Sequence, residues 1–312
     1  MTRAFVFPGQ GSQFIGMGKA LAEAEAPARL VFEEVNDALS QDLSAIMWDG
    51  SEDDLRLTEN TQPALMAVSM AIIRTLEAGG LKVADIASHV AGHSLGEYSA
   101  LCATGAFSIA DTAKLLKLRG QAMQRAVPVG EGAMAAILGL SLDVVNEVVK
   151  EAAEGEVVVS ANDNAEGQIV ISGHKAAVER AIVIAKEKGA KRGLLLPVSA
   201  PFHCPLMKPA AEEMKAALAE VAIERPSLPV IANVLAAPIS EPSGIATLLV
   251  EQVTGAVRWR ESVTAMASLG IDQVVEIGAG KVLTGLIRRI DKSLSFTKIQ
   301  EPADIEAFAA SL

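Results

Sequence analysis

The feature that most constrains the fold is a strand, a sharp turn and a helix that meet at residue 94. The apolar segment 86–91 predicts a strand, and it leads through Gly92-His93-Ser94-Leu95-Gly96 into a helical pattern that continues to Ala103. This is G-x-S-x-G in the context that a nucleophilic serine requires. The glycines relieve steric clash in such a turn, and the helix N-terminus directs its free N–H groups at developing negative charge. The pattern predicts an α/β chain with Ser94 as a nucleophile, and an ordinary helix N-terminus is the alternative.

Alternation of short strands and helices extends over most of the chain. Segments 4–7, 230–232 and 273–277 predict further buried strands, and 61–76 predicts a buried helix with Pro63 in its first turn. Such alternation favours a mainly parallel sheet covered by helices.

The segment 127–197 has a different order of elements. Its predicted elements are strand 133–138, helix 142–153, strand 157–161, polar turn 162–167, strand 168–172, helix 175–188 and strand 193–198. The order βαββαβ is typical of a ferredoxin-like unit. We therefore expect an inserted small domain at 127–197, and a catalytic core formed by 1–126 and 198–312.

Composition excludes several classes of protein. Half of the 312 residues are apolar, which is enough for a sizeable core and excludes a disordered chain. The formal net charge of −11 makes general nucleic-acid binding unfavourable, because affinity for phosphate needs a cationic surface. Two cysteines, Cys102 and Cys204, are too few for a disulfide framework. No apolar run is long enough to cross a membrane, and the first residues do not form a secretory signal, so we expect a cytoplasmic protein.

A nucleophilic serine needs a base, and the chain has four histidines. His89 falls in a strand, His93 adjoins the serine, and His174 begins a helix of the predicted small domain. His203 lies in the proline-braced loop 199–205, the kind of segment in which catalytic residues are frequent. Elimination favours His203 as the base, with a loop histidine that makes one hydrogen bond as the alternative. Cys204 is a weaker candidate nucleophile, because no neighbour in sequence would lower its pKa.

Three other patterns fail on inspection. Residues 9–14 approach a dinucleotide-binding loop but have Phe14 where its third glycine belongs. Residues 278–282 lack features of a phosphate-binding loop, and His89 and His93 lack the helical context of a zinc site. We therefore expect no cofactor and no metal.

Three motifs together carry a resemblance to a known family. They are Phe5-Val6-Phe7-Pro8-Gly9-Gln10-Gly11-Ser12-Gln13, Gly92-His93-Ser94-Leu95-Gly96-Glu97-Tyr98 and Ala200-Pro201-Phe202-His203. With them the chain resembles the malonyl-CoA:acyl carrier protein transacylases of fatty acid synthesis, relatives of polyketide acyltransferase domains. Further matches follow in order over nearly the whole chain, at 118–124, 161–173, 257–259 and 276–283.

The resemblance implies a fold, an activity and a set of roles. The implied fold is an α/β-hydrolase-like core with an inserted ferredoxin-like subdomain. The implied partners are malonyl-CoA and acyl carrier protein, without a cofactor, a membrane or nucleic acid, and the family is mostly monomeric. The implied roles are Ser94 as the acylated serine, His203 as the general base, Arg119 as the ligand of the malonyl carboxylate, the backbone N–H groups of Gln10 and Leu95 as the oxyanion hole, the main-chain carbonyl of Gln252 as the group that orients the histidine, and Phe202 as a residue that goes with malonyl selection.

Two other functions remain open from the residues alone. A serine hydrolase would share the turn at Ser94, but it would normally add an acidic residue and would not need Arg119. The alternative role of Arg119 is that of a cation on the surface of a helix, near Lys114 and Lys117. A non-enzymatic scaffold that binds a carrier protein is the third possibility. An acidic carrier would need a basic rim on this acidic chain, for which the candidates are Lys186, Lys188, Lys191, Arg192, Lys281, Arg288 and Arg289.

Overall fold

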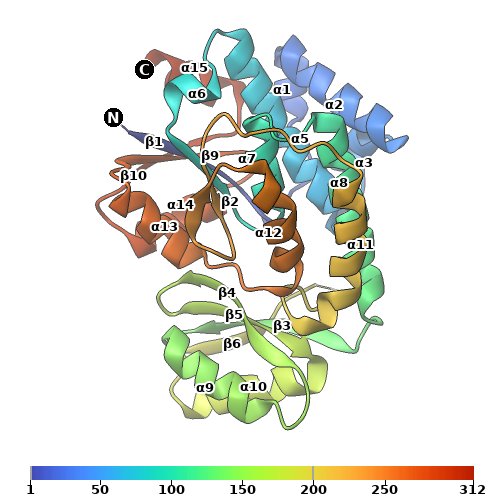
Figure 1. Cartoon of the computed structure of the whole chain (residues 1–312), viewed down its shortest axis with the longest axis vertical. Helices are drawn as coiled ribbons and strands as arrows, with labels where there is room; N and C mark the ends of the chain where they lie inside the picture. The colour runs from blue at the N-terminus through green and yellow to red at the C-terminus, as the bar shows by residue number, and fades with distance from the viewer. Residues whose placement is uncertain (1, 199) are drawn as a thin grey trace.

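The computed structural model describes residues 2–198 and 200–312, so Ser199, the first residue of the predicted histidine loop, lies outside the described residues. A six-stranded sheet has the order β10-β9-β1-β2-β7-β8. Figure 1 labels its strands β1, β2, β9 and β10. All neighbouring strands in it are parallel except β8, which is antiparallel to β7. Its strands are β1 (Arg3–Phe7), β2 (His89–Gly92), β7 (Val230–Ala232), β8 (Ala237–Ile239), β9 (Gln273–Ile277) and β10 (Ser295–Ile299).

Strand β1 shows why this sheet carries helices on both faces. Phe5 and Phe7 are fully buried in one apolar cluster with residues of α2, α5, α7 and α8, whereas Ala4 and Val6 are fully buried in another with residues of α13 and α14. Successive side chains of a strand point to opposite faces, so an apolar run without alternation needs cover on both sides. The helices in the same part of the molecule as this sheet are α1 (Lys19–Ala24), α2 (Ala26–Leu39), α3 (Leu43–Asp49), α4 (Glu52–Arg56), α5 (Thr58–Ala78), α6 (Val83–Ile86), α7 (Leu95–Ala103), α8 (Ile109–Ala126), α11 (Lys208–Ala219), α12 (Pro242–Thr254), α13 (Trp259–Ser268), α14 (Val282–Ile290) and α15 (Pro302–Ala310). A short 3₁₀ turn, Pro205–Met207, precedes α11.

Helix α5 is buried along most of its length, as its apolar sequence predicts, but it begins earlier than expected. Pro63 lies inside the helix, so the prediction that it occupies the first turn is wrong. The additional turn is anchored to α4: the Asn60 side chain donates to the Asp54 carbonyl at 2.9 Å and the Thr61 hydroxyl donates to the Leu55 carbonyl at 2.5 Å. These tertiary bonds stabilise a helix start that the sequence pattern does not mark.

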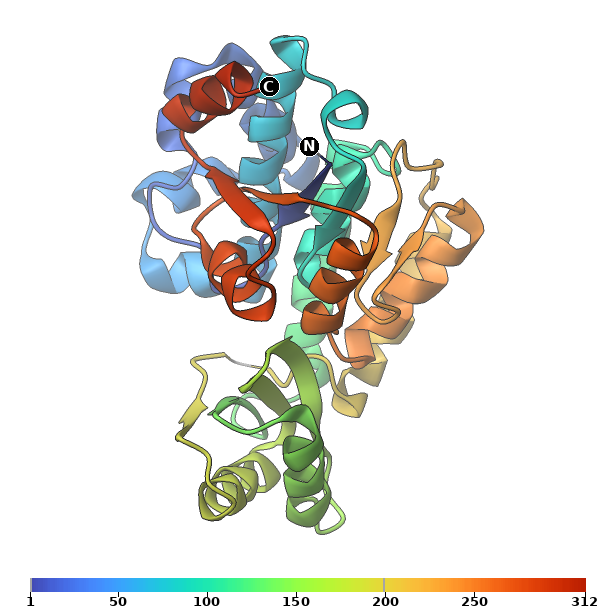
Figure 2. The ribbon, with the colours of Figure 1, turned by 90° about the vertical axis from the view of Figure 1, so that its left-hand side faces the viewer.

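A second, four-stranded sheet occupies one end of the molecule (Figures 1 and 2). Its elements follow the predicted order βαββαβ: β3 (Gly132–Leu138), α9 (Leu142–Ala152), β4 (Val158–Ala165), β5 (Gln168–His174), α10 (Lys175–Glu187) and β6 (Arg192–Leu195). All its pairings are antiparallel, in the spatial order β4-β5-β3-β6. Ala135 and Ile137 of β3 pack with α9 and α10, whereas Met134 and Ala136 on the opposite face line a cavity.

The largest difference from the sequence prediction concerns the polar segment 162–167. Strand β4 continues to Ala165, so Asn162 is not in a turn. The Val257 N–H donates to the Ala161 carbonyl at 2.9 Å, and the Asp163 N–H donates to the Val257 carbonyl at 3.0 Å. The strand is extended by its antiparallel pairing with β5, which continues to Ala165 and Gln168, and the bridge to Val257 adds bonds on its other edge.

Other boundaries also shift. The strand predicted at 86–91 begins at His89 because 83–86 form α6, the strand predicted at 193–198 ends at Leu195, and β8 and β10 were not predicted. Across the described residues, no helix is both long and apolar enough to cross a membrane.

Candidate active site

Ser94 lies at the junction of β2 and α7, in a backbone conformation that few non-glycine residues adopt (φ 54°, ψ −110°). Gly92 and Gly96 permit this turn. A Cβ on Gly92 would lie 1.9 Å from the Gly96 carbonyl, and a Cβ on Gly96 would lie 2.2 Å from the Phe7 carbonyl oxygen. Both positions therefore exclude a side chain, and the turn exposes the serine hydroxyl at the start of the helix.

His203 is hydrogen-bonded to this hydroxyl, with 2.8 Å between its Nε2 and the Ser94 Oγ. Its other ring nitrogen, Nδ1, faces two main-chain carbonyl oxygens, at 2.9 Å from Gln252 and 3.2 Å from Gly255. Because a carbonyl can only accept, Nδ1 must carry the proton and Nε2 is left to accept from the serine. Burial, and then the nearby Arg119 charge, lower the pKa of His203 to about 3, so the ring is neutral at neutral pH.

Arg119 is 1% exposed and reaches the same hydroxyl from α8. Its Nη2 donates to the Ser94 Oγ at 3.1 Å and to the Gln252 Oε1 at 2.9 Å, and its Nη1 donates to the Gln62 Oε1 at 2.8 Å. The guanidinium also lies over the Tyr98 ring, 5.6 Å from its centroid. The alternative of a helix-surface cation is therefore wrong.

The charge of Arg119 is held without an ion pair. Throughout residues 2–198 and 200–312, no carboxylate contacts its guanidinium directly, and its Nε has no hydrogen-bond partner. Burying a cation is costly unless an anion meets it. This arrangement next to the serine suits a substrate that carries a negative charge.

The two candidate oxyanion donors line the same cavity. Gln10 follows β1 and Leu95 is the first residue of α7, and both contact the cavity beside Ser94. Among the described residues, neither backbone N–H donates to a protein acceptor. Two free N–H groups beside a nucleophile can stabilise an oxyanion.

A cavity of about 390 Å³ opens above the serine, between the two sheets. The large sheet and its helices contribute Gln62, His93 and Ser94, and the second sheet contributes Met134, Asn162 and Val170. Phe202 lines it beside His203 and is 8% exposed. The site therefore lies at the interface between the two sheets, and residues of both form it.

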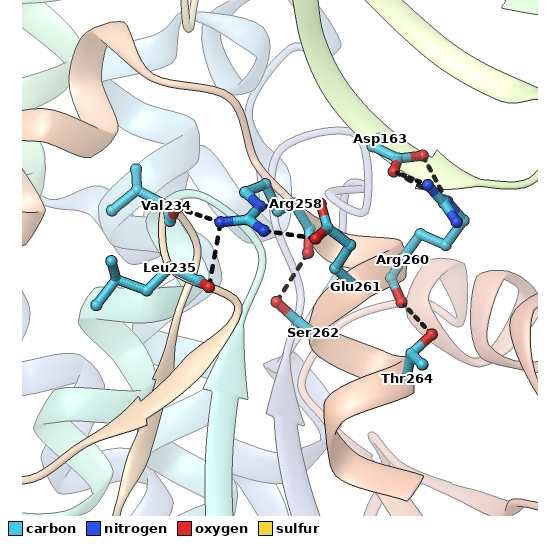
Figure 3. Close-up of polar contacts among 8 residues, drawn as sticks. All are labelled: Asp163, Val234, Leu235, Arg258, Arg260, Glu261, Ser262 and Thr264. Carbon is cyan, nitrogen blue, oxygen red and sulfur yellow. Dashed lines mark hydrogen bonds and ion pairs between the residues drawn. The ribbon is translucent and has the colours of Figure 1, made fainter. Parts of the chain in front are cut away.

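Several side-chain bonds hold the second sheet against the larger part of the molecule at this interface. The His93 Nε2 lies 2.8 Å from the Asn164 Oδ1, so His93 contacts β4 rather than the serine hydroxyl. Arg260 on α13 forms a two-point ion pair with Asp163, whose side chain is 5% exposed (Figure 3). In the same view Arg258 pairs with Glu261 and donates to the carbonyls of Val234 and Leu235, next to β7.

The other sequence candidates lie apart from the chemistry. The Cys204 thiol donates to the Pro201 carbonyl at 3.0 Å, and burial raises its pKa, which makes it a poor nucleophile. His174 accepts from the Val157 N–H through Nδ1, and His89 contacts Ser88. In the part of the chain that the structure describes, no group of three or more His, Cys, Asp or Glu side chains could hold a metal.

Comparison with known proteins identifies the family to which the chain belongs. The acyl transferase domain family matches residues 4–304. The chain belongs to the acyl transferase family. The malonyl CoA-acyl carrier protein transacylase of Bacillus subtilis (strain 168) is 45% identical over 304 residues, which cover 97% of this chain and 95% of that protein.

Solved structures of acyl transferases agree. The acyl-carrier-protein-S-malonyltransferase of Bartonella henselae is 56% identical with a TM-score of 0.98, covering 100% of this chain and 99% of that one. A malonyl-transacylase solved in complex with its type II polyketide acyl carrier protein is 43% identical with a TM-score of 0.97, covering 100% of both chains.

The fold thus brings all seven sequence-predicted site residues to one place. Six of them, Gln10, Ser94, Leu95, Arg119, Phe202 and His203, line the cavity, and Gln252 is fully buried behind it. Sequence reasoning missed three residues: Gln62, which accepts from Arg119, Asn233, which accepts from the Ser94 N–H, and Glu97, which accepts from Gln252. The only sequence signal for Glu97 is its place directly after the second glycine of G-x-S-x-G. For Gln62 and Asn233 the sequence carries no comparable signal.

Proposed function

We propose that this acyl transferase moves the malonyl group of malonyl-CoA to the phosphopantetheine thiol of acyl carrier protein, supplying malonyl-carrier protein for fatty acid synthesis. The observation that carries the proposal is the buried Arg119 guanidinium, which donates to the Ser94 Oγ without a carboxylate partner in the described chain. The names of the relatives state the same transfer, and one related structure was solved with its carrier protein.

The first half of the reaction forms a malonyl-serine. His203 accepts the Ser94 proton at Nε2, and the serine oxygen attacks the thioester carbonyl. The N–H groups of Gln10 and Leu95 stabilise the oxyanion, each donor being worth about 3–4 kcal/mol. The CoA thiolate leaves and takes the proton from His203.

The second half runs the same steps in reverse. The carrier thiol gives its proton to His203 and attacks the malonyl-serine carbonyl, which releases Ser94. The main-chain carbonyls of Gln252 and Gly255 keep the imidazole oriented in both halves. Phe202 borders the substrate next to His203 and favours an unsubstituted malonyl group.

The substrate carboxylate separates this function from simple hydrolysis. Arg119 offers its planar guanidinium to a carboxylate, and this geometry favours two-point binding. A serine hydrolase would normally orient its histidine with an acidic residue, whereas His203 faces two carbonyl oxygens here. The first feature favours a charged acyl group, and the second differs from the usual arrangement of a serine hydrolase.

The finer architecture belongs to the same proposal. The six-stranded part, 1–126 with 198–312, is an α/β-hydrolase-like catalytic core, and 127–197 is an inserted ferredoxin-like subdomain. The order β4-β5-β3-β6 with two helices on one face supports the second assignment. The protein acts as a monomer in the cytoplasm, as its family resemblance and its two free cysteines suggest.

The carrier docks on exposed basic residues, of which one group lies next to the cavity and another on the second unit. Lys281 and Arg288 are exposed on or next to α14, whose first residue, Val282, lines the cavity. Lys186, Lys191 and Arg192 are exposed on the second unit. Lys188 is a weaker candidate than the sequence suggests, because its ammonium already pairs with Glu151 and Glu147.

Intact-mass measurement tests the proposal directly. After incubation with malonyl-CoA, the wild-type protein should gain one malonyl group, and a holo-carrier should remove it. Ser94→Ala should stay folded and gain none. An adduct on the alanine variant, mapped to Cys102 or Cys204, would reject Ser94 as the nucleophile. A wild-type protein that forms an adduct with acetyl-CoA but none with malonyl-CoA would reject malonyl-CoA as the substrate.

A further inference from the structure

A buried carboxylate that takes no part in the proposed reaction lies directly behind the site. Glu97 is in the first turn of α7 and is 1% exposed. Its Oε2 accepts two hydrogen bonds, from the Gln252 Nε2 at 2.8 Å and from the Asn233 backbone N–H at 3.0 Å. Each of these two partners in turn bonds to Ser94.

The first partner, Gln252, connects Ser94, Arg119 and His203. Its Nε2 also donates to the Ser94 carbonyl at 3.0 Å, and its Oε1 accepts from the Arg119 Nη2 at 2.9 Å. Its main-chain carbonyl accepts from the His203 Nδ1. A side-chain amide has an oxygen and a nitrogen of nearly equal shape, so its orientation must be set by its neighbours.

Glu97 sets that orientation. If the Gln252 amide were turned over, its oxygen would face the Glu97 carboxylate and the Ser94 carbonyl, and its NH₂ group would face the Arg119 guanidinium. Acceptor would then meet acceptor and donor would meet donor, each buried and unsatisfied. Glu97 therefore acts together with the Ser94 carbonyl and Arg119 to keep the amide oxygen facing Arg119.

The second partner, Asn233, extends the same support to the serine turn. Its Oδ1 accepts from the Ser94 N–H at 2.7 Å, and its Nδ2 donates to the Gly92 carbonyl at 2.6 Å. These bonds hold the backbone that leads into Ser94, whose φ is positive. A strained backbone persists only where its surroundings fix it.

We propose that Glu97 is a positioning residue for malonyl selection: its Oε2 fixes the side-chain amide of Gln252, and Gln252 holds the Arg119 guanidinium within hydrogen-bond distance of the Ser94 hydroxyl. The inference rests on the proposed function, because it assigns Arg119 to the malonyl carboxylate. The role requires an acceptor oxygen at this place and does not require a negative charge. Burial raises the pKa of Glu97 to about 7, and a proton on its Oε1 would leave Oε2 free to accept.

Two conservative variants separate the oxygen from the charge. Glu97→Gln keeps an acceptor at the same distance and removes the charge, whereas Glu97→Asp keeps the charge and withdraws the acceptor by one methylene. The measurement is kcat/KM for malonyl-CoA and for acetyl-CoA on purified, folded protein. We expect Glu97→Gln to keep the malonyl-to-acetyl ratio within about threefold of wild type, and Glu97→Asp to lower it at least tenfold.

A matched control variant and a double-mutant cycle complete the test. Glu276 is equally buried and accepts from the backbone N–H groups of Leu283 and Thr284, away from Gln252, so Glu276→Asp should leave the ratio unchanged whatever it does to stability. In a Gln252→Leu background, Glu97→Asp should lower the ratio no further, because the two residues act as one unit.

Three outcomes would overturn the inference. They are a larger loss of ratio in Glu97→Gln than in Glu97→Asp, equal losses for both substrates in Glu97→Asp, or full additivity with Gln252→Leu. A wild-type protein without any preference for malonyl-CoA would instead refute the proposed function. The two failures are therefore distinguishable.

Discussion

Glu97 and His203 should make opposite contributions to the pH dependence of stability. Burial lowers the pKa of His203 from its ordinary value of 6.5 to about 3, so the unfolded chain binds a proton below pH 6.5 that the folded chain does not. Stability from this group falls as the pH falls. Burial raises the pKa of Glu97 from 4.5 to about 7, so the folded chain binds the extra proton, and stability from this group rises as the pH falls from 7.

The magnitudes follow from the two shifts. Between pH 8 and pH 5.5 the protonation of the unfolded histidine costs about 1 kcal/mol, and the protonation of folded Glu97 contributes about 2 kcal/mol. In wild type the two largely offset each other. Glu97→Gln removes the stabilising part, so the difference in unfolding free energy between wild type and variant should be about 2 kcal/mol larger at pH 5.5 than at pH 8.

Urea unfolding at the two pH values measures this difference, because all other titrating groups are common to both proteins. His203→Ala provides a control of opposite sign: relative to wild type it should become more stable by about 1 kcal/mol on going from pH 8 to pH 5.5. The same wild-type-to-variant difference at both pH values would show that Glu97 does not titrate in this window, and would refute the reasoning.

Three further predictions concern activity. Arg119→Ala should lower kcat/KM for malonyl-CoA by roughly two to four decades, since losing one side of a buried charge pair costs about 3–5 kcal/mol, and should leave acetyl-CoA transfer equal or faster; equal losses for both substrates would assign Arg119 to the fold. His203→Ala should slow both half-reactions in stopped-flow acylation and deacylation, because one imidazole serves as base and acid, and near-normal acylation would instead point to His93. Replacing both Lys281 and Arg288 with Glu should raise KM for the carrier at low salt while sparing acylation by malonyl-CoA, and an unchanged KM would place the carrier elsewhere.

Elements that depend on local pattern were predictable from the sequence. The turn at Ser94 follows from Gly92 and Gly96, whose missing side chains the turn requires, and the βαββαβ order follows from apolar periodicity and turn residues. His203 could be chosen because only four histidines were available. Gln252 was assigned through the family resemblance, and its carbonyl indeed lies 2.9 Å from the histidine.

Features that depend on distant partners were not predictable. Asn162 and Asp163 belong to a polar run that predicts a turn, yet the run continues the pairing with β5, and Val257 and Arg260 supply distant partners for it. Glu97 and Asn233 are 136 positions apart, and only the parallel neighbours β2 and β7 bring them together. The burial of Arg119 likewise depends on Gln62 and Gln252, which arrive from two other helices.

The position of Arg119 also bears on the basicity of His203. The two residues share one partner, the Ser94 Oγ, at 3.1 and 2.8 Å. The guanidinium charge is the second cause, after burial, that lowers the pKa of the histidine. A malonyl carboxylate on Arg119 would offset that charge and raise the pKa of His203 while the thioester is bound. An acetyl group brings no such charge, so it would meet a weaker base as well as an unpaired cation. On the proposed binding of the carboxylate by Arg119, selection for malonyl would act on proton transfer as well as on binding, through the one hydroxyl that both residues contact.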